Sequence, residues 1–155
     1  MANLIIDEVN KTELKDNVIY SSFDWKVLRE IKNIDSKISR GYLTSELKGK
    51  IYDKSPWLDF MSLYDIDSRE LPRLIKTLGG EAWHPKRKDI DKDMVRISHE
   101  EGLPVNVWTV NEKFEMLRMI EYGVDGIITD YPLRLKELCE NCLLYTSPSP
   151  RDKRQ

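Results

Sequence analysis

The 155-residue sequence predicts an α/β fold in which parallel strands alternate with helices and form part of a (β/α) barrel. The first observation is the strict alternation of short β-rich runs with amphipathic stretches, a pattern typical of parallel strands joined by right-handed crossovers. The second is that no glycine-rich phosphate loop follows any strand, which disfavours an open dinucleotide-binding sheet. The third is that polar residues lie where the strands end, as they do around the site of a barrel.

Each element is predicted from its local pattern of side chains. Apolar residues at helical spacing predict helices, and short runs of β-branched and aromatic residues predict strands. Helices are expected over residues 2–14, from residue 24 onward, in a short segment that begins at Ser55-Pro56, over 71–78, 91–101 and 111–122, and from residue 132. Strands are expected over residues 18–23, 37–44, 81–85, 104–110 and 126–129.

Polar and glycine residues mark the ends of several predicted helices. Gly79, Gly102 and Gly123 follow helical stretches, where glycine commonly adopts the left-handed conformation. Asn111 and Asp130 precede helices, and for both we favour helix capping over contact with a ligand.

The length of the chain and its last residues set the domain boundaries. A complete barrel typically needs about 250 residues, so this chain is too short to close one. Residues 1–142 follow the strand–helix pattern, whereas residues 143–155 are rich in proline, serine and basic residues. We expect this last segment to be a disordered and non-native tail.

Composition excludes several classes of partner. The net charge is −2, with 25 basic and 27 acidic residues scattered along the chain, so no basic patch indicates nucleic acid. No apolar run is long enough to span a membrane, and the first residues do not resemble a signal peptide. Cys139 and Cys142 are interpreted as ordinary thiols in a reducing compartment rather than zinc ligands. These features favour a cytoplasmic location, although the native N-terminus is expected to be missing.

Two motifs near the C-terminus carry a family resemblance. The segment Gly102-Leu-Pro-Val-Asn-Val-Trp-Thr-Val-Asn111 is followed, one helix later, by Gly123-Val-Asp-Gly-Ile-Ile-Thr-Asp-Tyr-Pro132. Together they resemble the signature of the glycerophosphodiester phosphodiesterases, and Ile19-Tyr-Ser-Ser-Phe23 resembles an earlier strand of the same barrel. The resemblance spans roughly residues 18 to 140 and implies a partial TIM barrel that holds about strands four to eight.

The resemblance implies a metal-dependent hydrolase of lipid and glycerol metabolism. Such an enzyme cleaves a small glycerophosphodiester to glycerol 3-phosphate and an alcohol, assisted by Ca²⁺ or Mg²⁺. The family's metal ligands and acid–base residues belong to motifs that are absent here and are expected upstream of Met1. We therefore expect no catalytic residue and no metal ligand in this chain, and no activity from it alone.

Four residues are candidates for contacts with substrate: Trp108, Ser22, His84 and Asn111. Alternation along the strand places Trp108 inside the barrel together with Asn106 and Val110. Only one of Ser21 and Ser22 can face the interior. His84 lies at a strand end but matches neither catalytic histidine of the family, and His99 is expected at the surface.

Two other functions stay open. A barrel of the same fold could bind a phosphorylated ligand or a partner protein without catalysis. Another phosphate-binding barrel enzyme is less favoured, because the glycine-rich loop that such a site uses is absent. An incomplete barrel also has open strand edges, through which copies of the chain could associate.

Overall fold

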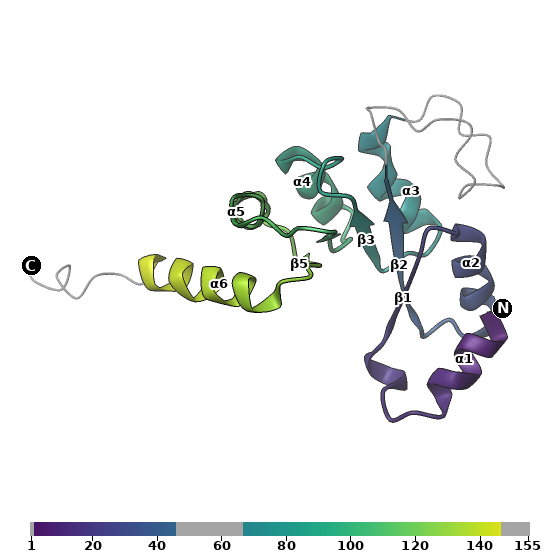
Figure 1. The fold of residues 1–155 in the computed structure, drawn as a ribbon. Coiled ribbons are helices and arrows are strands. Elements are labelled where there is room, and N and C mark those ends of the chain that lie inside the picture. The colour runs from purple at the N-terminus through teal and green to yellow at the C-terminus, as the bar shows by residue number, and fades with distance from the viewer. Residues whose placement is uncertain (1, 46–66, 147–155) are drawn as a thin grey trace, which may run out of the picture.

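The computed structural model of the protein describes residues 2–45 and 67–146, and the helix expected at Ser55-Pro56 lies outside them. The described part alternates helices and strands as the sequence predicts (Figure 1). The strands are β1 (Ile19–Ser22), β2 (Ser39–Thr44), β3 (Ala82–Pro85), β4 (Asn106–Val107) and β5 (Gly126–Ile127). The helices are α1 (Ala2–Asn10), η1 (Lys15–Asn17), α2 (Trp25–Ile34), η3 (Ser68–Glu70), α3 (Leu71–Thr77), α4 (Lys92–Glu100), α5 (Lys113–Tyr122) and α6 (Pro132–Thr146).

The five strands lie side by side in the order of the sequence and are parallel. β1 pairs with β2 and β2 with β3, with Ser21 opposite Gly41 and Leu43 opposite His84. Isolated bridges from Trp83 and Lys86 extend the pairing to the segment around β4, which in turn pairs with β5. An open doubly wound sheet reverses its strand order at a switch point, whereas a barrel adds each new strand beside the last. The observed order is that of a barrel.

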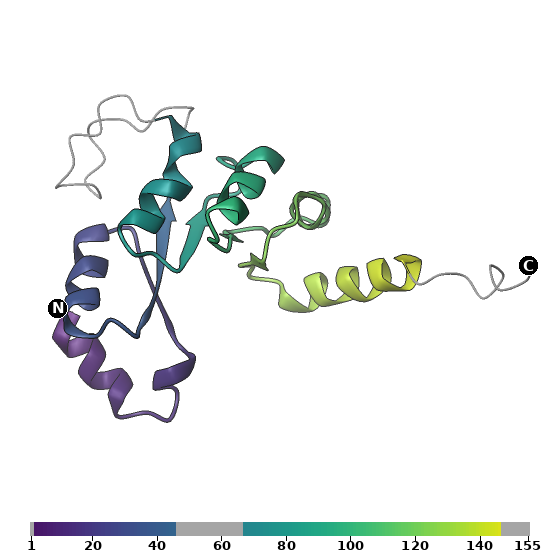
Figure 2. The ribbon, with the colours of Figure 1, turned by 180° about the vertical axis from the view of Figure 1, so that it is seen from behind.

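The helices pack on one face of this curved sheet. Side chains that alternate along the strands, among them Tyr42, Trp83 and Val105, are fully buried and form the main core with the helices. The rings of Trp25 on α2 and Tyr42 on β2 meet edge to face with centroids 5.0 Å apart. Seen from either side, α3, α4 and α5 follow one another around the strands and α6 extends away from them (Figures 1 and 2).

A buried arginine ties the amino ends of β2 and β3 together. Arg40 is 2% exposed, donates from Nε and Nη2 to the carbonyl of Gly79, and pairs with the carboxylate of Glu81. The second oxygen of Glu81 accepts from the Arg40 amide at 2.9 Å. Burial raises the pKa of the neighbouring Tyr42 to about 12. Because it pairs with Arg40 at the amino ends of β2 and β3, Glu81 lies at the end of the sheet opposite to the strand ends where a barrel carries its site.

Several boundaries differ from those predicted. Strands expected over 104–110 and 126–129 shorten to two residues each, because regular pairing ends where the chain turns toward α5 and α6. The first helix stops at Asn10 rather than residue 14, where the Thr12 hydroxyl donates to the carbonyl of Val9. Helix α6 continues to Thr146, past the expected boundary at residue 143, so residues 143–146 are helical. The rest of the expected tail, residues 147–155, lies outside the described residues.

The predicted glycine stops are confirmed. Gly79, Gly102 and Gly123 have φ angles of 81°, 64° and 80°, in the left-handed region that residues with a Cβ rarely adopt.

None of the described helices is long and apolar enough to cross a membrane.

Replacing Gly123 with alanine should destabilise the protein through backbone conformation alone. A Cβ at Gly123 would meet nothing within 4 Å, so we expect Gly123→Ala to cost about 1–2 kcal/mol of unfolding free energy from the left-handed φ angle. Asparagine tolerates this conformation better, so Gly123→Asn should cost less. Urea unfolding of the three proteins measures both, and equal losses for Ala and Asn would contradict the explanation.

Candidate functional site

Polar side chains from three strands meet on the inner face of the sheet, the face away from the helices. His84 of β3 lies at the centre and is 3% exposed. Its Nδ1 is 2.5 Å from Ser21 Oγ of β1, and its Nε2 is 2.9 Å from Asn106 Nδ2 of β4. Because all five strands are parallel, these side chains approach the edge where the strands end, which is where barrels place their sites.

Aromatic side chains lie beside this polar group. The indole Nε1 of Trp108 donates to the carbonyl of His84 at 2.7 Å, and the ring of Phe23 meets that of Trp108 edge to face at 5.4 Å. An aromatic wall next to buried hydrogen-bonding groups is the usual composition of a small-molecule site.

The structure brings together two of the four residues proposed to contact substrate. Trp108 and His84 are adjacent, whereas Ser22 lies apart and its hydroxyl oxygen accepts from the Asp24 amide at 3.0 Å at the start of α2. Ser21, and not Ser22, is the serine that meets His84. Whether any of these residues contacts substrate stays a prediction.

Three residues of this group were not selected from the sequence: Ser21, Asn106 and Phe23. Alternation with Trp108 did place Asn106 on the inner face, and that signal was sufficient to find it. The same alternation is wrong for Val110, which is buried in the main core together with Val105 and Val107.

Asn111 joins the loops that follow β4 and β5. Its Oδ1 accepts from the Thr129 hydroxyl and from the Asp130 amide, both at 3.1 Å, and its Nδ2 donates to the Asp130 carboxylate at 2.7 Å. The capping role predicted for Asn111 is therefore wrong. The N-cap of α5 is Glu112, which makes no side-chain cap, and the Asn111 side chain is already bound to the next loop.

A second connection holds the loop after β3 against the loop after β4. Arg87 Nε lies 2.9 Å from both carboxylate oxygens of Glu115, which is largely buried on α5, and its Nη1 donates to the carbonyl of Thr109. The Arg87 amide donates to the carbonyl of Trp108 at 2.8 Å. Charged hydrogen bonds of this kind are the stronger ones, so the segment that carries Trp108 is held on both sides.

The described residues do not fit a divalent cation. Within residues 2–45 and 67–146, no group of three or more His, Cys, Asp or Glu side chains converges on one point. The strand-end carboxylate of Asp130 is bound to Asn111, and Glu81 lies with Arg40 at the opposite end of the sheet. Hard cations such as Ca²⁺ and Mg²⁺ are usually held by carboxylates that converge on one point, and the described carboxylates do not converge in this way.

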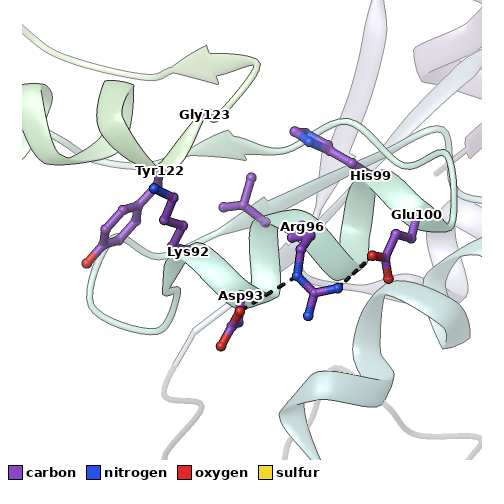
Figure 3. Close-up of a pocket in the computed structure, with 8 residues that line it drawn as sticks. Lys92, Asp93, Arg96, His99, Glu100, Tyr122 and Gly123 are labelled. Atoms are coloured by element: carbon purple, nitrogen blue, oxygen red, sulfur yellow. Dashed lines mark hydrogen bonds and ion pairs between the residues drawn. The ribbon is translucent and has the colours of Figure 1, made fainter.

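A groove of about 560 Å³ lies on the outer helical layer, between α4 and the end of α5 (Figure 3). Its charged lining is largely neutralised internally, because Arg96 pairs with Asp93 at 3.7 Å and with Glu100 at 2.6 Å. His99 also lies here, exposed as predicted, with Nε2 2.8 Å from the carboxylate of Asp125. Partial burial opposes ionisation of Asp125, but hydrogen bonds from the Val105 amide and from His99 lower its pKa below the ordinary value. The groove is separate from the strand ends.

The sequence model of the glycerophosphoryl diester phosphodiesterase family matches residues 1–134. The chain belongs to this family. Among curated relatives, the uncharacterised protein YqiK of Bacillus subtilis is 26% identical over 91% of the chain and 51% of its own length. A glycerophosphodiester phosphodiesterase of Caldanaerobacter subterraneus is 28% identical over 86% of the chain and 47% of its own length. The chain thus spans about half the length of the curated relatives it matches.

Solved structures of this phosphodiesterase family share the fold. A glycerophosphoryl diester phosphodiesterase assigned by similarity in Silicibacter pomeroyi superposes with a TM-score of 0.77 and 30% identity over 92% of this chain and 44% of that one. A phosphodiesterase of Oleispira antarctica, in complex with the product sn-glycerol-3-phosphate, superposes with a TM-score of 0.68 and 19% identity over 90% of this chain and 49% of that one. The α/β fold predicted from the sequence is confirmed, with few enough strands to be a partial barrel.

Removing the Asn111 side chain should loosen the last two strand-end loops. Asn111→Ala leaves the Asp130 amide and the Thr129 hydroxyl without this partner, and we expect a loss of about 0.5–1.5 kcal/mol of unfolding free energy, because these bonds are at most partly buried. Asn33→Ala, at an exposed position on α2, is the matched control and should stay within about 0.5 kcal/mol of wild type. Thermal or urea unfolding tests this, and similar losses in both variants would show that Asn111 is not a connection between loops.

Stability should fall in mild acid because of His84. Burial lowers the pKa of His84 below its ordinary value of 6.5, so the unfolded chain takes up a proton at this ring before the folded chain does. The contribution is fully present above pH 6.5 and is lost as the pH falls toward the lowered folded-state pKa. His84→Gln should flatten the pH dependence of the unfolding free energy below about 6.5, whereas His99→Gln should retain the His84 contribution. Parallel pH profiles for wild type and His84→Gln would refute this.

Proposed function

We propose that these residues are the C-terminal part of a metal-dependent phosphoric diester hydrolase that cleaves glycerophosphodiesters to glycerol 3-phosphate and an alcohol. In this reaction a water oxygen forms a new bond to phosphorus, the bond from phosphorus to the alcohol oxygen breaks, and the alcohol leaves with a proton. The observation that carries the proposal is the match of residues 1–134 to the phosphodiesterase family.

The inner face of the sheet supports this proposal. Trp108 and Phe23 form an apolar wall suited to a carbon chain such as glycerol, beside the polar group around His84. The Oleispira phosphodiesterase, whose fold this chain shares, holds glycerol 3-phosphate as its product. A cytoplasmic location belongs to the same proposal, since Cys139 is an exposed free thiol that suits a reducing compartment.

Expressed as it stands, the 155-residue chain should not hydrolyse glycerophosphodiesters. The described residues do not assemble a cation site, and loss of general acid–base groups alone costs about 10²–10⁴-fold in rate. The assay measures release of glycerol 3-phosphate from glycerophosphocholine with Ca²⁺ or Mg²⁺. Turnover that a chelator abolishes and that His84→Gln removes would contradict this expectation.

The matched experiment uses the reading frame upstream of Met1. We expect it to encode the His-Arg-Gly and Glu-x-Asp motifs of the family, and the extended protein should hydrolyse the same substrate with a divalent cation. Absence of those motifs, or an extended chain that binds glycerol 3-phosphate without turnover, would favour the alternative of a non-catalytic binding barrel.

We also expect copies of the chain to associate through the outer strands. Among the described residues, β1 and β5 each pair on one side, and Ile19 and Ile128 at these edges are both 44% exposed. Sedimentation should show association that rises with concentration and that Ile128→Lys reduces. Leu133→Lys, on α6 away from the sheet edge and 75% exposed, is the control. Equal effects of the two substitutions would argue against edge pairing.

A further inference from the structure

The polar group around His84 is one layer that crosses all five strands. Each strand contributes one residue to it: Ser21, Gly41, His84, Asn106 and Gly126. The two glycines provide space, because a Cβ at Gly41 would overlap the His84 ring and one at Gly126 would overlap the Asn106 amide. The sheet is thus shaped to hold these two larger side chains at this depth.

The direction of the hydrogen bonds determines which nitrogen of His84 carries the proton. Asn106 Nδ2 can only donate, so Nε2 of His84 accepts and has no proton. Burial disfavours the charged ring, so the single proton is on Nδ1 and is donated to Ser21 Oγ. The Ser21 hydroxyl in turn donates to the carbonyl of Gly41 at 3.4 Å. The hydrogen bonds of the layer therefore run in one direction, from the Asn106 amide through His84 and Ser21 to the carbonyl of Gly41.

This arrangement excludes a serine nucleophile activated by His84. A general base must accept the serine proton, but Nδ1 already carries one and Nε2 is occupied by Asn106. The same residue also meets the aromatic wall, but through its backbone, since the main-chain carbonyl of His84 accepts from the indole of Trp108.

We propose that His84 is a positioning residue, held by Ser21 and Asn106 as the neutral Nδ1–H tautomer, whose ring forms the floor of the strand-end site and fixes the strand segment whose main-chain carbonyl holds Trp108. The inference rests on the proposed function for the identity of that site. It assigns the ring no proton transfer, and it makes Ser21 and Asn106 the residues that orient it.

The tautomer can be read directly by NMR of the ¹⁵N-labelled 155-residue chain at neutral pH. We expect a pyrrole-type shift for Nδ1 of His84 and a pyridine-type shift for Nε2, with His99→Gln used to assign the two histidines. Asn106→Asp replaces the donor with an acceptor and should move the proton to Nε2. Two observations on wild type would overturn the proposal: an Nε2–H tautomer or a doubly protonated ring of His84. Covalent labelling of Ser21 in wild type by a fluorophosphonate would overturn it as well.

The positioning role has its own readout in the indole N–H of Trp108, assigned with Trp108→Phe. His84→Asn retains a side-chain donor toward Ser21 and should keep exchange of this proton slow. His84→Leu keeps the main-chain acceptor but removes the side-chain bonds to Ser21 and Asn106 that hold this segment of β3, so exchange should accelerate by about tenfold, as expected for loss of roughly one hydrogen bond. Equal exchange rates in both variants would overturn the role. If His84→Leu does not fold, the tautomer in wild type and in Asn106→Asp still decides. Neither readout uses hydrolysis, so failure of the hydrolase assay and failure of this proposal are separate results.

Discussion

The alternation of side chains along five parallel strands is the constraint on which the other features depend. Tyr42, Trp83 and Val105 face the helices and are fully buried, whereas Gly41, His84 and Asn106 face the interior. A shift of one residue in the register of any strand would exchange these two sets. Indoles would then enter the polar layer and an imidazole would lie among methionines and leucines, so the apolar core and the polar layer specify the same register independently.

Elements with a local signal were predictable from the sequence. The left-handed glycines after α3, α4 and α5 end their helices where expected, and Asp24 caps α2 with its carboxylate. Strand boundaries were less predictable, because a strand ends where its partner ends. Around β4, the bridges end at Trp108 and only one backbone bond, from the Val110 amide to the Ile128 carbonyl, follows, although the β-rich sequence runs on to Val110.

The contents of the site were only partly predictable for a related reason. Trp108 and His84 could be selected as candidates because a strand-end position and a chemically distinctive side chain are visible in one segment. The choice between Ser21 and Ser22 depends on which face of β1 meets β2 and β3, and Asn111 depends on Thr129 and Asp130, which approach it only in the folded chain. Local propensity favoured a helix cap at Asn111, but contact with the following loop prevailed.

Arg40 and Glu81 fasten the sheet at its amino end, whereas Trp108, Asn111 and Arg87 are held at its carboxyl end. The two ends share no side-chain hydrogen bond or ion pair among those described here. Sequence change in the strand-end loops therefore need not remove any of the bonds at the amino end. A lineage built on this sheet can diversify its reactions while retaining its architecture, which is consistent with solved relatives that keep the fold at 19–30% identity.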